Sequence, residues 1–304
     1  MRILISGPSG AIGAALAGRL AGVHELRGLA RDPGRVPPEL GLELVAGDAL
    51  SGAGLERALA DIEVAYYLIH SMEPAPRGSF ASRDRTAARH FAAAAARAGV
   101  RRIVYLGGVL PREGAVSPHL ASRAEVERIL LAAVPDSVAL RASVVIGARS
   151  RSFQAIVRLI ERLPVIPLPP WRHSRTQPID QRDAVAYLAA AARASGVGGR
   201  SLDIAGPEVL SYGAMIERIA EHLLVHRPAL SVPLTMGGLA STVAAWLSGE
   251  QVALLGPLMD SLRGDLLADD RLARSELAVR LHSFDAAVEN ALREWERVEP
   301  LRGR

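Results

Sequence analysis

The 304-residue chain contains neither cysteine nor lysine. Without cysteine there can be no disulfide bond, thiol nucleophile or thiolate metal site, and we expect a reducing, cytoplasmic location and no metal ion. Because all 36 basic residues are arginine, no side chain can form a Schiff base with a carbonyl substrate. The net charge of +4 is spread along the chain. This spread argues against a nucleic-acid partner, which would require a basic stripe.

Aromatic residues are also scarce, at 4% of the chain, and the abundance of alanine favours helix-rich layers over a β-sandwich or barrel. Residues 229–248 carry no charge and have about the length that crosses a membrane. Pro233, Gly237 and Gly238 interrupt this run, so we favour a buried cover over a ligand cleft, while peripheral membrane association stays open. The first residues already have the pattern of a strand, so we expect no signal peptide.

Short apolar runs alternate with helical patterns over the first half of the chain. Strands are expected at residues 2–6, 25–30, 42–47, 63–69, 101–108 and 137–147, and helices at 11–22, 53–61, 81–99 and 117–133. Nearly continuous apolar strands separated by helices imply a parallel sheet that is covered on both faces. Because crossovers between parallel strands are right-handed, the pattern predicts an α/β fold with a doubly wound Rossmann sheet.

The pattern changes after Ser150. A helix is expected at 153–163, then a proline-rich turn segment at 164–171, a helix within 177–194 that Asp183 caps, a strand at 200–206 and a helix at 211–224. We therefore predict two parts. Residues 1–150 form an NAD(P)-binding domain, and residues 151–304 form a small, mostly helical lobe, interleaved with the sheet domain, that supplies a substrate pocket.

The segment ISGPSGAIG, residues 5–13, places three glycines between the first strand and the first helix. Gly7 permits a tight turn, Gly10 lets a pyrophosphate approach the backbone, and Gly13 lets the helix pack close to the strand. The unpaired N–H groups of the helix start can then bind the phosphates. This spacing, in a strand–turn–helix context, predicts a dinucleotide site.

The second predicted strand runs into LARDPGR, residues 29–35, where Arg31 is the first polar residue and Arg35 follows four positions later. A guanidinium binds a 2′-phosphate through paired hydrogen bonds and gains little from a bare hydroxyl. We therefore predict NADP(H) in preference to NAD(H). Asp32 keeps the alternative open, because a carboxylate at this place binds the ribose 2′-hydroxyl of NAD.

The ends of later strands complete the predicted cofactor site. Asp48 can accept a hydrogen bond from the adenine amino group, and His70 is expected to be a positioning or packing residue there rather than a catalytic one. The full predicted set is Gly7, Ser9, Gly10, Ala11, Ile12, Gly13, Arg31, Asp48, Ala49, Leu68, Ile69, His70, Gly107 and Arg123.

Several of these motifs resemble the atypical and extended short-chain dehydrogenase/reductase superfamily. The similarity is closest to its NAD(P)H-binding group, which includes NmrA-like proteins and the accessory subunit of mitochondrial complex I. It rests on SGPSGAIG, LARDP, GDAL, AYYLIHSM, AGVRRIVYLGG and LRASVVIG, and on the later QPIDQRDAVAYL and IAGPEVLSYGAM. The resemblance covers nearly the whole chain and is strongest over the first 150 residues.

The resemblance implies a hydride-transfer site of Ser or Thr, Tyr and Lys, and this sequence departs from it at all three positions. Gly107–Gly108 stands at the serine position, His119 at the tyrosine position and Arg123 at the lysine position. Arg123 can bind ribose hydroxyls but cannot give up a proton. His119 is an acid by type, yet it lies in the first helical turn, after Ser117 as N-cap and Pro118, where the helix dipole and Arg123 oppose its charged form. A neutral imidazole could still polarise a carbonyl, or it could merely contact a ligand.

Three functions follow from these residues. The first is an NADPH-dependent reductase of a small, apolar carbonyl or enone, in which His119 or water replaces the tyrosine. The second is a non-catalytic NADP(H)-binding redox sensor or assembly subunit, which the loss of all three usual residues favours. The third is an epimerase or dehydratase of nucleotide sugars. It is the weakest of the three, because the tyrosine that such an enzyme uses is missing.

Overall fold

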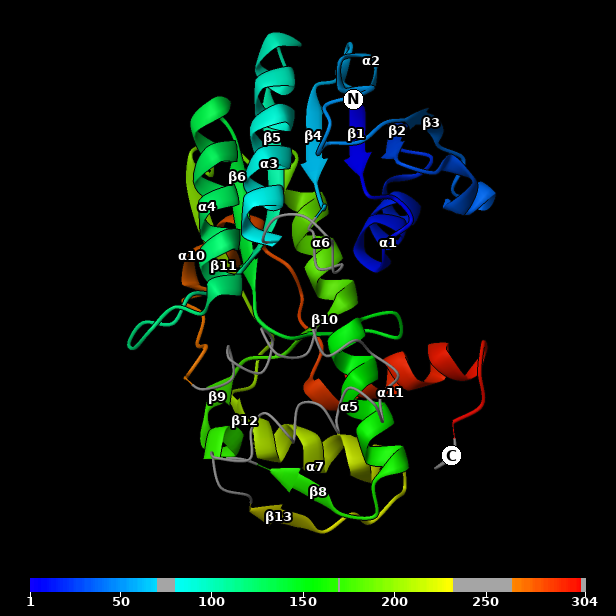
Figure 1. The fold of residues 1–304 in the computed structure, drawn as a ribbon, viewed down its shortest axis with the longest axis vertical. Coiled ribbons are helices and arrows are strands. Elements are labelled where there is room, and N and C mark those ends of the chain that lie inside the picture. The colour runs from blue at the N-terminus through cyan, green and yellow to red at the C-terminus, as the bar shows by residue number, and fades with distance from the viewer. Residues whose placement is uncertain (70–79, 169, 232–263, 302–304) are drawn as a thin grey trace.

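Six apolar runs of the first half and one of the second half form a parallel sheet in the computed structural model, which describes residues 1–69, 80–168, 170–231 and 264–301. The seven strands are ordered β11-β6-β5-β4-β1-β2-β3 (Figure 1), and all neighbours run parallel. Their bounds are β1 Arg2–Ser6, β2 Glu25–Ala30, β3 Glu43–Ala46, β4 Val64–Tyr67, β5 Arg102–Gly108, β6 Val138–Ala142 and β11 Arg200–Ile204. The predicted doubly wound α/β fold is confirmed.

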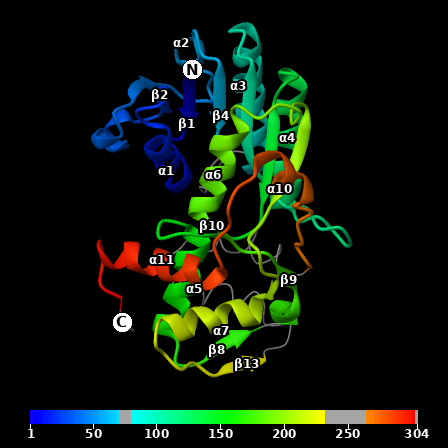
Figure 2. The same ribbon diagram turned by 180° about the vertical axis from the view of Figure 1, so that it is seen from behind.

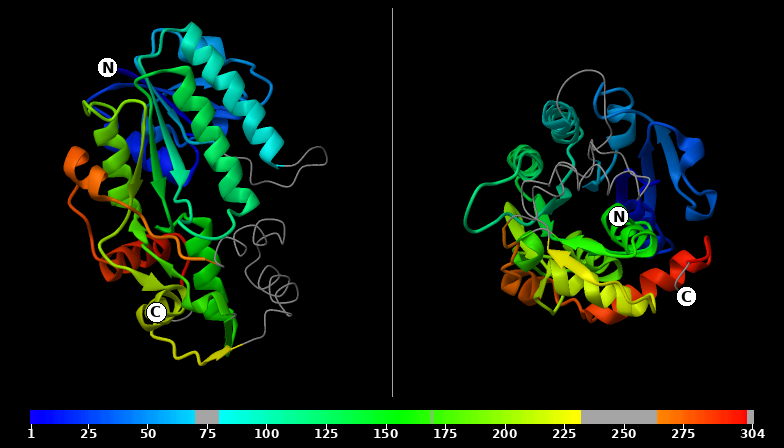
Figure 3. Two further views of the ribbon diagram at one scale, coloured as in Figure 1. Left: turned by 90° about the vertical axis from the view of Figure 1, so that its left-hand side faces the viewer. Right: turned by 60° about the horizontal axis from the view of Figure 1, so that its bottom comes forward.

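Helices cover both faces of this sheet (Figure 3). α1 (Ala11–Leu20), α6 (Gln181–Ala191) and α10 (Arg271–Leu277) pack on one face, and α2 (Leu55–Leu59), α3 (Phe80–Arg97) and α4 (Pro118–Ala133) pack on the other. Successive residues of β1 take part in opposite cores: Ile3 and Ile5 belong to the first apolar cluster and Leu4 to the second. A strand that is buried on both sides must be apolar at every position, which explains the unbroken apolar runs.

The second half builds a separate apolar cluster at the end of the sheet toward which the strands point (Figures 1 and 2). Its cluster residues include Phe153, Ile160, Met215, Val288 and Trp295. The elements around it are β7 Val145–Ile146, α5 Arg151–Arg162, β8 Ile166–Leu168, η3 Pro170–His173, β9 Arg175–Thr176, β10 Ile179–Asp180, β12 Leu210–Ser211, α7 Tyr212–His222, β13 Ala229–Ser231 and α11 Phe284–Glu296.

The single strand expected at residues 137–147 is wrong, because the chain forms two strands, β6 and β7. The Ser143 hydroxyl donates to the Gln177 carbonyl at 2.6 Å, and Val144 O accepts from Ile179 N at 2.9 Å. These bonds draw the chain out of the main sheet, so that β7 pairs with β10 instead. The expectation of turns alone at 164–171 is also wrong, since β8 lies within this range and pairs with β13.

Asp183 is not the cap of helix α6. Asp180 is the N-cap, and its side chain accepts from the Arg182 N–H at 2.7 Å. The pairing of β10 with β7 holds Ile179 and Asp180 in extended conformation, which fixes the helix start at Gln181. Asp183 then lies in the first turn and binds both the backbone N–H and Nδ1 of His282, at 2.8 Å and 2.6 Å.

Within the described ranges, no helix combines the length and the apolar character that a membrane span requires. Most of the uncharged segment 229–248 lies outside the described residues, which resume at 264.

Candidate functional site

The carboxyl ends of the strands and the second half of the chain enclose a cavity of about 1010 Å³. All the described residues that were predicted to bind cofactor line this cavity, from Gly7 to Arg123, and so does His119. His70 lies outside the described residues. The structure therefore brings together side chains and amides that are more than 100 positions apart in sequence.

The glycine-rich turn owes its shape to Gly7 and Gly13. Gly7 has a φ of +74°, a left-handed conformation that favours glycine, and its N–H donates to Leu29 O at 3.1 Å. A Cβ on Gly13 would overlap the Gly7 carbonyl oxygen and lie 3.0 Å from the Gly7 carbonyl carbon. Helix α1 can therefore approach strand β1 this closely only without a side chain at this position.

The start of helix α1 offers backbone donors to the cavity. Gly10 is the N-cap and supplies no side-chain hydrogen bond. The amides of Ala11, Ile12 and Gly13, in the first turn, have no acceptor within the helix, and all three residues line the cavity. Amides and helix dipole together suit an anionic diphosphate, so the turn fits a dinucleotide.

Arg149 adds a charge to this turn that sequence analysis missed. Its Nη2 donates to the Ser9 carbonyl at 2.9 Å, which places a guanidinium beside the glycine-rich turn from a segment 140 residues later. No local signal marked it, because its position depends on how the segment after β7 returns toward helix α1.

The side chains after β2 face the cavity. Arg31, Asp32 and Arg35 all line the cavity. The Asp32 carboxylate accepts from the Gly34 N–H at 3.0 Å and caps the short helix η1 (Pro33–Arg35). This bond engages one carboxylate oxygen of Asp32 in its own turn.

Hydrogen bonds fix the chain at the carboxyl ends of β3 and β4. Asp48 lines the cavity and accepts from the Leu50 N–H at 3.0 Å. The buried Ser6 hydroxyl donates to Tyr66 O at 2.8 Å and accepts from the Leu68 N–H at 3.1 Å. Ser6 thus joins the ends of β1 and β4 and holds Leu68 at the wall.

Arg123 is fixed at the end of strand β5. Its Nη2 donates to Leu106 O at 2.6 Å, and its guanidinium lies 5.9 Å from the centre of the Tyr105 ring. A Cβ on Gly108 would lie 2.9 Å from Leu120 Cδ2 and 3.6 Å from Arg123 Cδ. Glycine at this position, where the resemblance implies a serine, therefore leaves room for helix α4 and for Arg123.

His119 lies at the start of helix α4. The Ser117 side chain caps the helix by accepting from the Leu120 N–H at 3.3 Å, and Pro118 is the first helical residue, as expected. Burial, and then the charge of Arg123, lower the pKa of His119 to about 4. The imidazole is therefore neutral near pH 7, where it can donate one hydrogen bond but is not an imidazolium.

No described tyrosine replaces the missing one. Burial raises the pKa of Tyr105, whose ring is buried beneath Arg123. Tyr212 lines the far end of the cavity, where burial raises its pKa to about 12. Neither phenol is a base near neutral pH.

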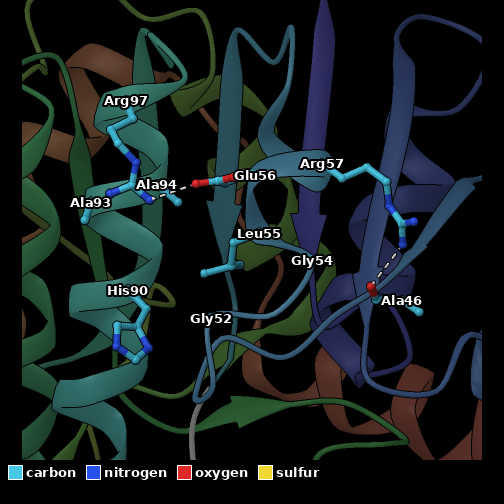
Figure 4. A pocket seen from close by; sticks show the side chains of 10 residues that line it. All are labelled: Ala46, Gly52, Gly54, Leu55, Glu56, Arg57, His90, Ala93, Ala94 and Arg97. Carbon is cyan, nitrogen blue, oxygen red and sulfur yellow. Dashed lines mark hydrogen bonds and ion pairs between the residues drawn. The ribbon is translucent and has the colours of Figure 1, made fainter.

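A second, shallower cavity of about 570 Å³ lies between α2 and α3 (Figure 4). Arg97 pairs with Glu56 at 3.5 Å, whereas Arg57 extends the other way, to Ala46 O at 3.3 Å. The polar side chains of this second cavity thus bind one another or the backbone, and they do not converge on a common point. It contains neither the glycine-rich turn nor His119.

Comparison with known proteins agrees with this geometry. A sequence model of a family described as NAD(P)H-binding matches residues 7–139. A curated relative from Streptomyces griseus subsp. griseus, (4-alkanoyl-5-oxo-2,5-dihydrofuran-3-yl)methyl phosphate reductase, is 29% identical over 223 residues, which are 69% of each chain.

Solved structures share the fold over nearly the whole chain. Protein gox2253 superposes with a TM-score of 0.76 at 20% identity and covers 99% of both chains. UDP-glucuronic acid 4-epimerase from Bacillus cereus, in complex with NAD, gives 0.74 at 17% identity, covering 98% of this chain and 99% of its own. The dehydratase TunA gives 0.72 at 20% identity with the same coverage. At these identities the likeness shows the fold alone.

These findings show that residues 7–139 match an NAD(P)H-binding family and that the fold is shared with NAD-binding proteins of known structure. The family match supports a nicotinamide dinucleotide as the ligand of this part of the chain.

The Gly13→Ala substitution is expected to weaken dinucleotide binding at least tenfold and to lower the melting temperature, because the added methyl overlaps the Gly7 carbonyl. Gly18→Ala on the same helix is the matched control, since a Cβ there meets nothing within 4 Å. It should leave binding unchanged and stabilise the helix slightly. Calorimetric titration with NADPH and thermal unfolding measure both effects. Unchanged binding in Gly13→Ala would contradict the close-packed turn.

The low pKa of His119 predicts a loss of stability in acid. In the unfolded chain the imidazole of this residue is protonated near pH 6.5, and in the folded protein only near pH 4. Between these values the unfolded state binds more protons, so the free energy of unfolding is highest above pH 6.5 and decreases as the pH drops toward 4. His119→Gln should therefore lose less unfolding free energy over this range than the wild type. Exposed His226, changed to Gln, is the control. An NMR titration of His119 with a midpoint near 6.5 would refute the buried, Arg123-facing placement.

Proposed function

We propose that the protein is an NADPH-dependent reductase of a small, apolar carbonyl or enone. The observation that carries this proposal is that the glycine-rich turn, His119, Arg123 and an apolar wall line one cavity. In this proposal residues 1–150 bind the cofactor and residues 151–304 shape the substrate end. Bound NADPH would supply the hydride.

The charges around the cavity suit a phosphate-rich cofactor. Six arginines line it against two aspartates, and both aspartates accept backbone hydrogen bonds. We assign Arg31 and Arg35 to the 2′-phosphate, Arg149 to the diphosphate and Arg123 to the nicotinamide ribose. The lining arginines are Arg31, Arg35, Arg83, Arg123, Arg149 and Arg151, and the aspartates are Asp32 and Asp48.

We assign His119 the task of polarising the substrate carbonyl. Its neutral imidazole has one N–H, which can donate to the oxygen on which negative charge develops during reduction. Because its pKa of about 4 makes it a poor store of protons near pH 7, water supplies the proton that completes the reaction. Reduction of an enone then adds hydride to the β-carbon and this proton to the α-carbon.

The relative from Streptomyces griseus supports this substrate class. Its name describes the reduction of an oxo-dihydrofuran that carries an alkanoyl group and a phosphate ester. Its substrate thus combines an unsaturated carbonyl system with an apolar chain and an anionic group.

A non-catalytic, NADP(H)-binding protein is the second candidate. The observation that favours it is that Gly107–Gly108, His119 and Arg123 replace all three usual residues, and that Arg123 is bound to Leu106 O. Such a protein would gain stability from the cofactor and turn over no carbonyl.

Consumption of NADPH with a panel of enones and ketones separates the two candidates. The wild type should oxidise NADPH in the presence of at least one apolar enone. His119→Ala should lower kcat about 100- to 1,000-fold, the range for loss of one donor to a developing oxyanion. His119→Asn, which keeps an N–H donor, should retain part of the rate. Tight NADPH binding without turnover across the panel would establish the non-catalytic alternative instead.

The preference for NADPH is tested by Arg31→Glu. Loss of a charged hydrogen bond to the 2′-phosphate should weaken NADPH binding about 10- to 100-fold and change NADH binding little. Arg19→Glu, on the exposed side of α1 and outside the cavity, is the matched charge control and should affect neither cofactor. Equal weakening of both cofactors by Arg31→Glu would remove the basis for this preference.

A further inference from the structure

The cavity has a charged end and an apolar end. Every charged side chain that lines it belongs to residues 31–151. From residue 155 onward the lining side chains carry no charge, and we call this part the apolar chamber. It consists of Ala155, Ile156, Leu159, Leu163, Ile166, Pro167, Leu168, Trp171, Gln181, Tyr212, Met215, Ile216 and Leu266.

Helix α5 contributes apolar side chains both to the core and to the cavity. Phe153, Val157 and Ile160 are fully buried in the third apolar cluster. Ile156, which packs at the edge of this cluster, and Leu159 are only half-buried and line the apolar chamber. Among the described residues, Leu159 belongs to none of the three apolar clusters. An apolar wall of this kind inside a cavity favours a ligand of matching character.

The backbone of the apolar chamber is paired within the protein. Strand β8 pairs with β13, and Ile166 N donates to Pro228 O at 3.0 Å. Two side-chain oxygens in the described wall, the Tyr212 hydroxyl and the Gln181 amide oxygen, are buried without a hydrogen-bond partner. The other lining side chains from residue 155 onward are apolar apart from the indole N–H of Trp171. A ligand that fills this space would therefore be bound mainly by apolar burial.

We infer that the apolar chamber binds an alkyl or alkanoyl chain of the substrate. The chain lies among α5, β8 and α7, and the reactive carbonyl lies at the charged end, within reach of His119 and the cofactor. This inference rests on the proposed function for the reaction, whereas the binding of the chain does not depend on turnover. The substrate class is thus an enone with a medium-length alkyl chain.

A homologous series of 1-alken-3-ones, from butenone to decenone, tests this inference with NADPH. Because burial of each methylene contributes a roughly constant free energy, kcat/KM should rise about two- to fourfold per added methylene until the apolar chamber is full. Leu159→Asn, which has the same branching but a polar end, should flatten this rise and leave NADPH affinity unchanged. Leu131→Asn is the control, since Leu131 is also a half-buried helical leucine but lies outside the cavity.

Calorimetric titration with saturated 2-alkanones, at saturating NADP⁺, measures binding without turnover. Affinity that increases with chain length, and that Leu159→Asn abolishes, supports the inference even if no enone is reduced; the proposed function alone then fails. Enones reduced at rates independent of chain length overturn the inference and leave the proposed function standing. Absence of ketone binding at every chain length also overturns it.

Discussion

The close approach of helix α1 to the Gly7 carbonyl is the constraint on which the candidate site depends. Without a side chain at Gly13 the helix begins directly after β1, and its first amides lie at the carboxyl edge of the sheet. Strand order then places the other groups around this turn: Arg31 after β2, Asp48 after β3 and Gly107 in β5. A shift of the helix would separate the amides from all of them.

The residues at the tyrosine and lysine positions change the electrostatics of the site. The resemblance implies a lysine that lowers the pKa of a tyrosine. Here Arg123, held by Leu106 O, acts together with burial to lower the pKa of His119. The result is a neutral hydrogen-bond donor where the superfamily has a proton donor.

The cavity joins two environments that serve different parts of a ligand. Arginines and backbone amides surround one end, where anionic groups are stabilised. Helices α5 and α7 and strand β8 surround the other end, where the lining is mainly apolar and uncharged. A substrate that is polar at its reactive end and apolar along its chain would be oriented by this difference alone.

Local spacing in the sequence determined the main strands and helices, the glycine-rich turn and the capped start of α4, because each depends on residues close together in the chain. The depressed pKa of His119 followed in direction from Arg123 one turn away, although the larger cause, burial, needed the fold. Only the tertiary structure decided the break between β6 and β7, the Asp180 cap, the contact of Arg149 with Ser9 and the apolar side chains that α5 contributes to the cavity. All of these arise from contacts between segments far apart in sequence, and local periodicity does not predict which distant segments will be in contact.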